Sequence, residues 1–268
     1  MKAKIDLKPL VISAPFGNYI QPDFATATMG TFTAARRGGV FNRLWRMGLT
    51  MRYYWKPRAW VNKIGLRNPG IDWVVDRVKR GKLDVSDKII SVHGFVAEDW
   101  WKLFDRVASL KPLAMELNIS CPNVGHISWP ADLFSRAVDT GVTVILKLPP
   151  VNFRLAFDAG YASGIGIFHC CNTLPVPCGG MSGRPLKPVA IQCIGDLVGG
   201  AGGKKDITII GGGGILTGDD VKDYRDAGAD YFAVGAKLMS YQTLGKGKGL
   251  LDILEKSRVY CSDRLNAN

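Results

Sequence analysis

Residues 114–150 decide the fold and read AMELNISCPNVGHISWPADLFSRAVDTGVTVILKLPP. Residues 114–119 and 142–148 are apolar runs of strand length, and residues 131–139 between them have the apolar spacing of a helix. Parallel neighbouring strands cannot be joined by a tight hairpin and need a crossover connection, which is usually a helix. This strand–helix–strand unit therefore predicts an α/β protein with a parallel sheet.

The same alternation continues in both directions along the chain. At 268 residues, the candidates are a doubly wound open sheet and a closed barrel. No G-x-G-x-x-G motif follows the first expected strand, which weakens the dinucleotide-binding open sheet. We therefore expect a single-domain (β/α)8 TIM barrel over residues 1–268, with no linker or repeat that divides it. The expected strands are 9–13, 27–32, 88–92, 114–119, 142–148, 166–170, 207–211 and 231–234, and the expected helices are 71–79, 98–110, 131–139, 153–162, 188–198, 219–227 and 250–259.

Residues 40–62 fit this alternation poorly. They combine six aromatic side chains with several Arg and Lys residues. We expect a rim excursion, such as a hairpin, above the second strand, where its aromatic side chains cover the barrel mouth or an oligomer contact. Binding to an anionic surface is the alternative, because the wider stretch 36–82 has thirteen basic and only two acidic residues.

The composition excludes several classes of protein. A hydrophobic fraction of 47% and a charged fraction of 22% are ordinary for a globular protein. No apolar run approaches the roughly 18 residues of a membrane span, and the first residues do not resemble a targeting segment. The six cysteines include no C-x-x-C pair and no histidine at zinc-ligand spacing. We expect a cytoplasmic protein with reduced thiols and no metal site.

Candidate functional groups follow the expected strands, where β/α barrels place their active sites. Gly213–Gly214 after the seventh strand and Gly235–Ala236 after the eighth resemble the phosphate site of such barrels, and residues 179–183 are expected to form a third glycine turn. Glycines that only permit tight turns are the alternative, which is less favoured because the three turns follow adjacent strands. Lys147 ends the fifth strand, and a buried lysine needs an anionic or polar partner.

Asparagines and one cysteine lie near the ends of other strands. Asn68, Asn118, Asn123 and Asn172 offer donors and acceptors to a planar ligand with imide and carbonyl groups, although asparagine is also a common turn residue. Cys121 follows the fourth strand and, as a thiolate, is a candidate nucleophile or base. No pairing with a histidine at a protease spacing supports the nucleophile.

Together, these stretches resemble the dihydroorotate dehydrogenase family. They occur in the order of the family and cover nearly the whole chain, and a cysteine at position 121 resembles the soluble class of the family. The similar stretches are PLVISAPFG (9–17), GLRNPG (65–70), ELNISCPN (116–123), VILKLPP (144–150), NT (172–173), GGMSGRPLKPVAI (179–191), IIGGGGI (209–215) and GADYFAVGAKLM (228–239).

The resemblance implies an FMN-dependent enzyme that oxidises dihydroorotate to orotate in de novo pyrimidine biosynthesis. Cys121 matches the catalytic base of the family, which takes a proton from C5 of dihydroorotate while C6 gives a hydride to the flavin. Lys147 matches a catalytic lysine beside the N1/O2 edge of the flavin. The resemblance places Ala14, Thr31, Asn118, Lys147, Gly183, Gly213, Gly214, Gly235 and Ala236 at the cofactor, and Asn68, Asn118, Asn123, Asn172 and Thr173 at the pyrimidine substrate.

Two departures from the family pattern leave alternatives open. Gly30 stands where the family has a lysine that contacts both flavin and substrate, and residues 174–178 replace a longer family insertion. The alternatives are a related FMN barrel for another pyrimidine, of the dihydropyrimidine or dihydrouridine type, and a catalytically weakened barrel that serves as a binding subunit. We also expect a homodimer and consider an electron-transfer subunit as a partner, with the electron acceptor, fumarate or NAD, left open. Nucleic acid is not the expected partner.

Overall fold

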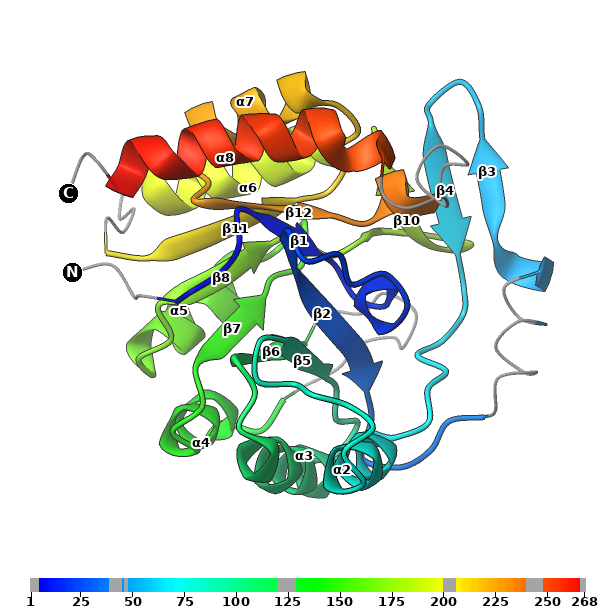
Figure 1. Ribbon diagram of the computed structural model, residues 1–268, viewed down its shortest axis with the longest axis vertical. Helices are drawn as coiled ribbons and strands as arrows, with labels where there is room; N and C mark the ends of the chain where they lie inside the picture. Colours follow the sequence, from blue (N-terminus) through cyan, green and yellow to red (C-terminus); the bar gives the residue numbers. More distant parts are fainter. Residues whose placement is uncertain are drawn as a thin grey trace.

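The fold was taken from a computed structural model, which describes residues 5–38, 45, 48–119, 129–199, 206–239 and 248–265. Eight parallel strands in these residues close into a barrel in the order β1–β2–β5–β6–β7–β8–β11–β12, with β12 paired to β1. The helices between the strands lie outside this barrel (Figure 1). The expected TIM barrel is confirmed.

The observed elements follow the predicted ones closely, because local apolar periodicity specifies both strands and helices. Their ends differ from the expected ends by at most two residues, except that the last helix ends six residues later. The barrel strands are β1 (Leu10–Ile12), β2 (Ala25–Phe32), β5 (Ile89–Val92), β6 (Ala114–Asn118), β7 (Val144–Lys147), β8 (Ile167–Cys170), β11 (Thr208–Gly212) and β12 (Tyr231–Val234). The helices are α2 (Ile71–Lys79), α3 (Ala97–Leu110), α4 (Leu133–Asp139), α5 (Arg154–Ala162), α6 (Leu186–Val198), α7 (Gly218–Asp226) and α8 (Leu251–Leu265), with short 3-10 turns η1 (Phe16–Asn18), η2 (Ala236–Met239) and η3 (Lys248–Leu250).

A second, antiparallel sheet stands beside the barrel in the order β3–β4–β10–β9. Strands β3 (Arg52–Tyr54) and β4 (Ala59–Asn62) form a hairpin within the stretch 40–62. The glycine turn expected at residues 179–183 is wrong. These residues form β10 (Gly179–Gly183), which pairs with β4 and with β9 (Leu174–Val176). A Cβ atom on Gly179 or Gly183 would collide with a backbone carbonyl of the β4 region, so these glycines permit close strand pairing.

The barrel interior is apolar at the amino-terminal ends of the strands. Seven inward-facing side chains pack with Leu7 in this layer: Val11, Ile89, Ala114, Ile145, Ile167, Ile210 and Ala233. Because side chains alternate between the two faces of a strand, the next inward position lies two residues further along. Those next positions are largely polar, and they form the floor of the site described below. The larger apolar cluster lies between the strands and the surrounding helices.

No helix in the described ranges is long and apolar enough to cross a membrane.

Candidate active site

A polar layer fills the barrel interior at the carboxyl ends of the strands. Ser91, Glu116, Lys147 and His169 each stand two residues after an inward apolar residue, on β5, β6, β7 and β8 respectively. All four are at most 6% exposed. Buried polar side chains at this end of a β/α barrel mark a candidate active site, because the active sites of such barrels lie there.

Glu116 is the centre of this layer. Its Oε2 lies 2.7 Å from Nδ1 of His169, and its Oε1 lies 3.8 Å from Nζ of Lys147. Burial alone would raise the pKa of Glu116, but the charge of Lys147 and hydrogen bonds from His169 and Ser91 lower it to about 2. The carboxylate is therefore ionised at neutral pH and supplies the negative charge that buried Lys147 needs.

His169 is neutral in this arrangement. Burial and the neighbouring charge of Lys147 both lower the pKa of His169, and they outweigh the opposing effect of Glu116. Because ionised Glu116 has only acceptors, Nδ1 of His169 carries the proton and donates it. His93 lies on the other side of β6, where its Nδ1 is 2.6 Å from the carbonyl oxygen of Asn118. Burial likewise lowers the pKa of His93.

A chain of side-chain hydrogen bonds extends this layer toward the mouth. Asn118 donates from Nδ2 to Oγ1 of Thr31 over 2.9 Å, and its Oδ1 accepts from Nδ2 of Asn172 over 2.8 Å. Oγ1 of Thr31 is 3.0 Å from Oγ of Ser91. The backbone N–H of Thr173 donates to Oδ1 of Asn172 over 2.9 Å. The structure therefore brings four predicted ligand residues together with fixed side-chain orientations.

Asn68 has a well-defined role within the chain. Its Oδ1 accepts from the backbone N–H groups of Thr33 and Gly70 over 3.1 and 2.8 Å. Its Nδ2 donates to Oγ1 of Thr33 and to the carbonyl of Leu66 over 3.0 and 2.7 Å. These bonds hold the loop after β2 against the loop before α2. Contact of Asn68 with a substrate stays a prediction.

The glycine turns after β11 and β12 lie beside one another, because these strands pair. Gly213 and Gly214 have φ of +113° and +88°, a backbone conformation that residues with a side chain rarely adopt. A Cβ atom on Gly214 would stand 2.7 Å from the carbonyl oxygen of Gly183, and one on Gly213 would stand 2.8 Å from the side chain of Leu186. The chain therefore packs tightly against this turn, and Gly183 lies next to it.

The turn after β12 has more room. Apart from its chain neighbours, the nearest described atom to a Cβ atom on Gly235 would be Cβ of Ser13 at 3.7 Å, and Ser13 precedes Ala14. Ala236 follows Gly235 and begins η2. The predicted phosphate-side residues thus lie on neighbouring turns at one side of the barrel mouth. Their contact with a phosphate stays a prediction.

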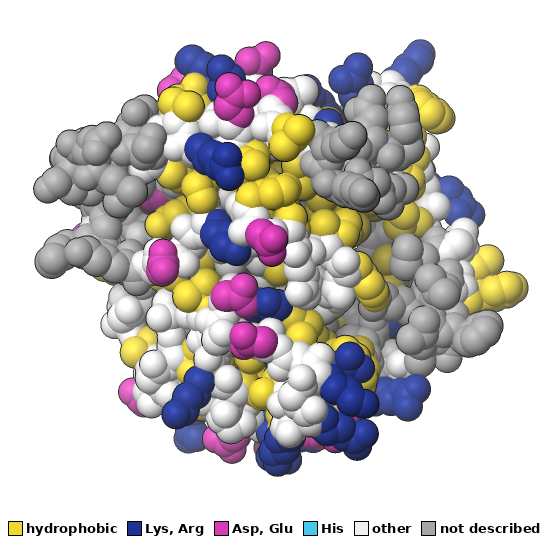
Figure 2. Space-filling view, in the orientation of Figure 1, with side chains coloured by type: hydrophobic (Ala, Val, Ile, Leu, Met, Phe, Trp, Pro, Cys, Tyr) yellow, Lys and Arg dark blue, Asp and Glu magenta, His cyan; other side chains and the backbone are white. Residues whose placement is uncertain are grey.

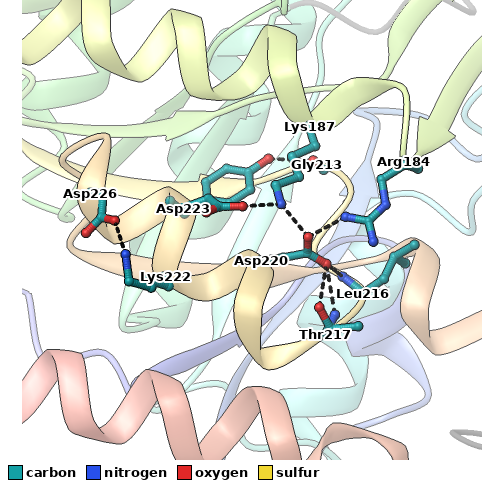
Figure 3. A network of polar contacts seen from close by, with 10 residues as sticks. Arg184, Lys187, Gly213, Leu216, Thr217, Asp220, Lys222, Asp223 and Asp226 are labelled. Carbon is teal, nitrogen blue, oxygen red and sulfur yellow. Dashed lines mark hydrogen bonds and ion pairs between the residues drawn. The ribbon is translucent and has the colours of Figure 1, made fainter.

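A carboxylate cluster that the sequence analysis missed supports this side of the mouth (Figure 3). Oδ1 of Asp220 binds Arg184 and, over 2.5 Å, Nζ of Lys187. Its Oδ2 accepts from the backbone N–H groups of Leu216 and Thr217 over 2.9 and 3.0 Å. The cluster joins the start of α6 to the start of α7. The T-x-x-D spacing of 217–220, a capping box at the start of α7, was the available sequence signal.

Burial alone would raise the pKa of Asp220. Hydrogen bonds from Lys187, Leu216 and Arg184, together with the charge of Lys187, lower it to about 2 instead. The cluster also raises the pKa of Lys187, although burial acts against this. Both cations are therefore held by the protein itself, next to the predicted phosphate turns.

Gly30 stands at an irregularity of β2, between residues that pair with β5 in different registers. Its φ is +111°, and a Cβ atom there would collide with the carbonyl of Ser91. Asn18 binds both backbone groups of Gly30, with Nδ2 donating to its carbonyl over 3.0 Å and Oδ1 accepting from its N–H over 3.1 Å. This backbone has no place for a lysine side chain.

Two predicted residues, Cys121 and Asn123, lie outside the described residues. Burial raises the pKa of Cys171 well above its usual value, and contact with Cys193 and burial do the same for Cys170. These two cysteines are thus unsuited to act as thiolates. Within the described ranges no group of three or more His, Cys, Asp or Glu residues is arranged to hold a metal ion.

Glu116 and His169 are site residues that the sequence analysis missed. The sequence signal for them was the alternation of inward and outward side chains along strands β6, β7 and β8. Glu116, Lys147 and His169 each follow an inward apolar residue by two positions, so all three point into the barrel.

Comparisons with known proteins agree with this fold. The family model described as dihydroorotate dehydrogenase matches residues 17–150 and 164–245. The catalytic subunit of dihydroorotate dehydrogenase B (NAD(+)) from Alkaliphilus metalliredigens is 30% identical over an alignment of 223 residues, which covers 74% of this chain and 72% of that protein. The protein of the same name from Listeria innocua is 35% identical over an alignment of 202 residues, which covers 65% of each protein.

Solved structures show the same fold at lower identity. The ligand-free DHODH of Eimeria tenella has a TM-score of 0.69 at 18% identity, and the alignment covers 99% of this chain and 86% of that chain. The DHODH of the same organism in complex with ferulenol has a TM-score of 0.70 and covers 97% and 82%.

Proposed function

Because the chain belongs to the dihydroorotate dehydrogenase family, whose members are flavin oxidoreductases acting on a CH–CH group, we propose that it binds FMN and oxidises dihydroorotate to orotate in pyrimidine biosynthesis. The observation that best supports this proposal is the polar layer at the barrel mouth. Lys147 lies there with a fixed counter-charge, next to Asn118 and Asn172, whose amides are already oriented. A planar ligand with several carbonyl groups suits such a set of donors and acceptors.

The described residues also fit FMN. The turns at Gly213–Gly214 and Gly235–Ala236 lie side by side, and bare backbone at such turns lets a phosphate approach N–H groups closely. Lys147, Thr31 and Asn118 would hold the ring, with Ala14 and Gly183 flanking the cofactor. When bound, FMN would supply the acceptor for the hydride that leaves the substrate.

The protein's own residues bind, orient and move a proton in this proposal. Glu116 fixes the ammonium of Lys147, which in turn faces negative charge that develops on the bound ligand. Asn118 is oriented by Thr31 and Asn172. Cys121 would accept the proton from C5 of dihydroorotate, with Asn68, Asn123 and Thr173 completing the substrate contacts.

Absorbance of the purified protein tests this proposal. We expect a flavin spectrum that dihydroorotate bleaches without oxygen. Cys121→Ala is expected to keep the flavin and slow bleaching by about 10²–10⁴-fold, the usual contribution of a general base. Cys178→Ala removes an exposed thiol and serves as the matched control. A yellow protein that dihydroorotate does not bleach would refute the substrate, and a colourless protein that takes up no added FMN would refute the cofactor.

Gly30 favours a second candidate substrate. The backbone of β2 cannot house the lysine that the resemblance places there, so the positive charge expected to hold the substrate carboxylate is missing. A pyrimidine without that carboxylate, such as a dihydrouracil, would not need it. Faster anaerobic bleaching by dihydrouracil than by dihydroorotate would establish this candidate. A catalytically weakened barrel would instead show FMN binding with no bleaching by either compound.

Partners and location are part of the same proposal. The relatives described above are catalytic subunits by name, so we propose an electron-transfer subunit as partner, a homodimer as the catalytic unit, and a cytoplasmic location. Co-purification from cells with a second polypeptide that carries electrons to NAD would support the first of these. Transfer of electrons from the isolated chain to fumarate would argue against it.

A further inference from the structure

The hairpin of β3 and β4 has a surface that the proposed reaction does not use. It stands away from the barrel at the edge of the molecule (Figure 1). We call the described residues 48–63 the basic hairpin. Four of its exposed side chains are cationic: Arg52, Lys56, Arg58 and Lys63.

No acidic residue lies close enough in the sequence to neutralise this positive charge. The chain has no Asp or Glu between Asp23 and Asp72. Among the ion pairs of the described residues, none includes a side chain of the basic hairpin. Figure 2 shows basic and apolar side chains together at this edge of the molecule. The hairpin therefore presents uncompensated positive charge to whatever approaches it.

Large apolar side chains lie among these charges. Trp55 at the hairpin tip is 82% exposed, and Leu49 and Tyr54 are 53% and 47% exposed. Trp55 is held in place, because its ring packs edge-on against Tyr53 with centroids 4.9 Å apart, and Tyr53 packs on Trp60 at 4.8 Å. The tip thus offers an ordered indole to a partner at little cost in side-chain entropy.

The combination argues against two kinds of partner. A second copy of this chain in a two-fold dimer would bring the same cationic patch against itself, which is repulsive. Single-stranded nucleic acid is bound by a basic groove lined with aromatic platforms. Here the charges lie on an edge hairpin of the small antiparallel sheet and not in a groove.

We propose that the basic hairpin docks the protein on anionic phospholipid surfaces. Trp and Tyr side chains favour the boundary between headgroups and acyl chains, and Lys and Arg beside them are attracted to anionic headgroups. Trp55 at the tip enters this boundary while Lys56 beside it stays at headgroup level, since long cationic side chains keep their charge in the polar layer. The docking is peripheral and reversible by salt.

Vesicle sedimentation of the full-length protein tests this inference. Two vesicle types are compared, pure phosphatidylcholine and a mixture with about 30% phosphatidylserine. We expect binding to the mixture only, loss of that binding in high salt, and a blue shift of tryptophan fluorescence. The double variant Trp55→Ser/Lys56→Glu is expected to bind at least about tenfold more weakly.

A matched control removes the same side chains elsewhere. Trp73 and Lys79 are exposed on α2, and Trp73→Ser/Lys79→Glu is expected to leave vesicle binding unchanged. Wild-type protein that does not sediment with the mixture would overturn the inference, as would equal losses in both double variants. Tight binding of single-stranded RNA that outcompetes the vesicles would assign the hairpin to nucleic acid instead. A dimer in analytical ultracentrifugation that only Trp55→Ser/Lys56→Glu dissociates would assign it to self-association.

Discussion

Glu116 inside the barrel and Asp220 beside its mouth are two buried carboxylates that reach the same pKa, about 2, by different routes. Glu116 depends on side chains alone: the charge of Lys147 first, then its contacts with His169 and Ser91. Asp220 accepts from two backbone N–H groups as well as from two cations.

The two carboxylates also differ in what surrounds their partners. Lys147 is 6% exposed, and Oε1 of Glu116 has no hydrogen-bond partner within the described part of the chain. The side chain of Arg184 beside Asp220 is 38% exposed and can be hydrated. A buried ion pair is costly to break because the remaining charge cannot reach water. We infer that the interior pair is tightly coupled, whereas the cluster at the mouth has redundant contacts.

Substitution of Glu116 tests this difference with the largest expected effect. Glu116→Gln removes the carboxylate beside buried Lys147 and is expected to lower the free energy of unfolding by about 3–5 kcal/mol. Urea denaturation measures the change. Adding Lys147→Met is expected to restore part of the loss, because it removes the buried positive charge. A loss below about 1 kcal/mol would contradict tight coupling between Glu116 and Lys147.

Acid titration measures the same coupling in the unmodified protein. The pKa of Glu116 is about 2 in the folded chain and 4.5 without its partners, so its stabilisation is complete above pH 4.5 and lost as the pH falls toward 2. At 1.36 kcal/mol per unit, Glu116 contributes about 3 kcal/mol over this range. Urea denaturation at several pH values should show a weaker acid dependence in Glu116→Gln than in the wild type. Equal slopes in the two proteins would contradict the assignment.

Asp220→Asn is expected to have a smaller effect, about 1–2 kcal/mol. The amide oxygen still accepts from the N–H groups of Leu216 and Thr217, and the cation of Arg184 remains partly hydrated. Thermal or urea unfolding measures the difference. If Asp220→Asn lowers the free energy of unfolding as much as Glu116→Gln does, the two carboxylates do not differ as inferred.

Asp76→Asn is expected to give the smallest loss in the free energy of unfolding among these variants. Asp76 pairs with Arg80 on α2 over 2.8 Å, and the two side chains are 51% and 63% exposed. The expected loss is no more than about 0.5 kcal/mol, because both partners stay hydrated and salt screens the pair. A larger value in the same urea assay would indicate that helix α2 itself depends on this residue.

The sequence predicted α2 at its observed bounds because nine residues with a clear apolar face suffice to define a helix. It predicted Lys147 as an inward residue from its place at a strand end. It missed the role of Glu116, although the same alternation places it inside the barrel. It also did not indicate that Asn68 is occupied by its own loop, since Thr33 lies 35 residues away.

The sequence by itself determined the order of strands and helices, the barrel and the local position of each polar side chain. Strand alternation and helical periodicity are patterns of neighbouring residues, so they can be read from the sequence. Only the tertiary structure decided that Gly179–Gly183 is a strand, because its partner β4 lies about 120 residues earlier in the chain. The tertiary structure also decided the ionisation of Glu116 and Asp220. A pKa depends on burial and on charges from other elements, and the closed barrel brings those together.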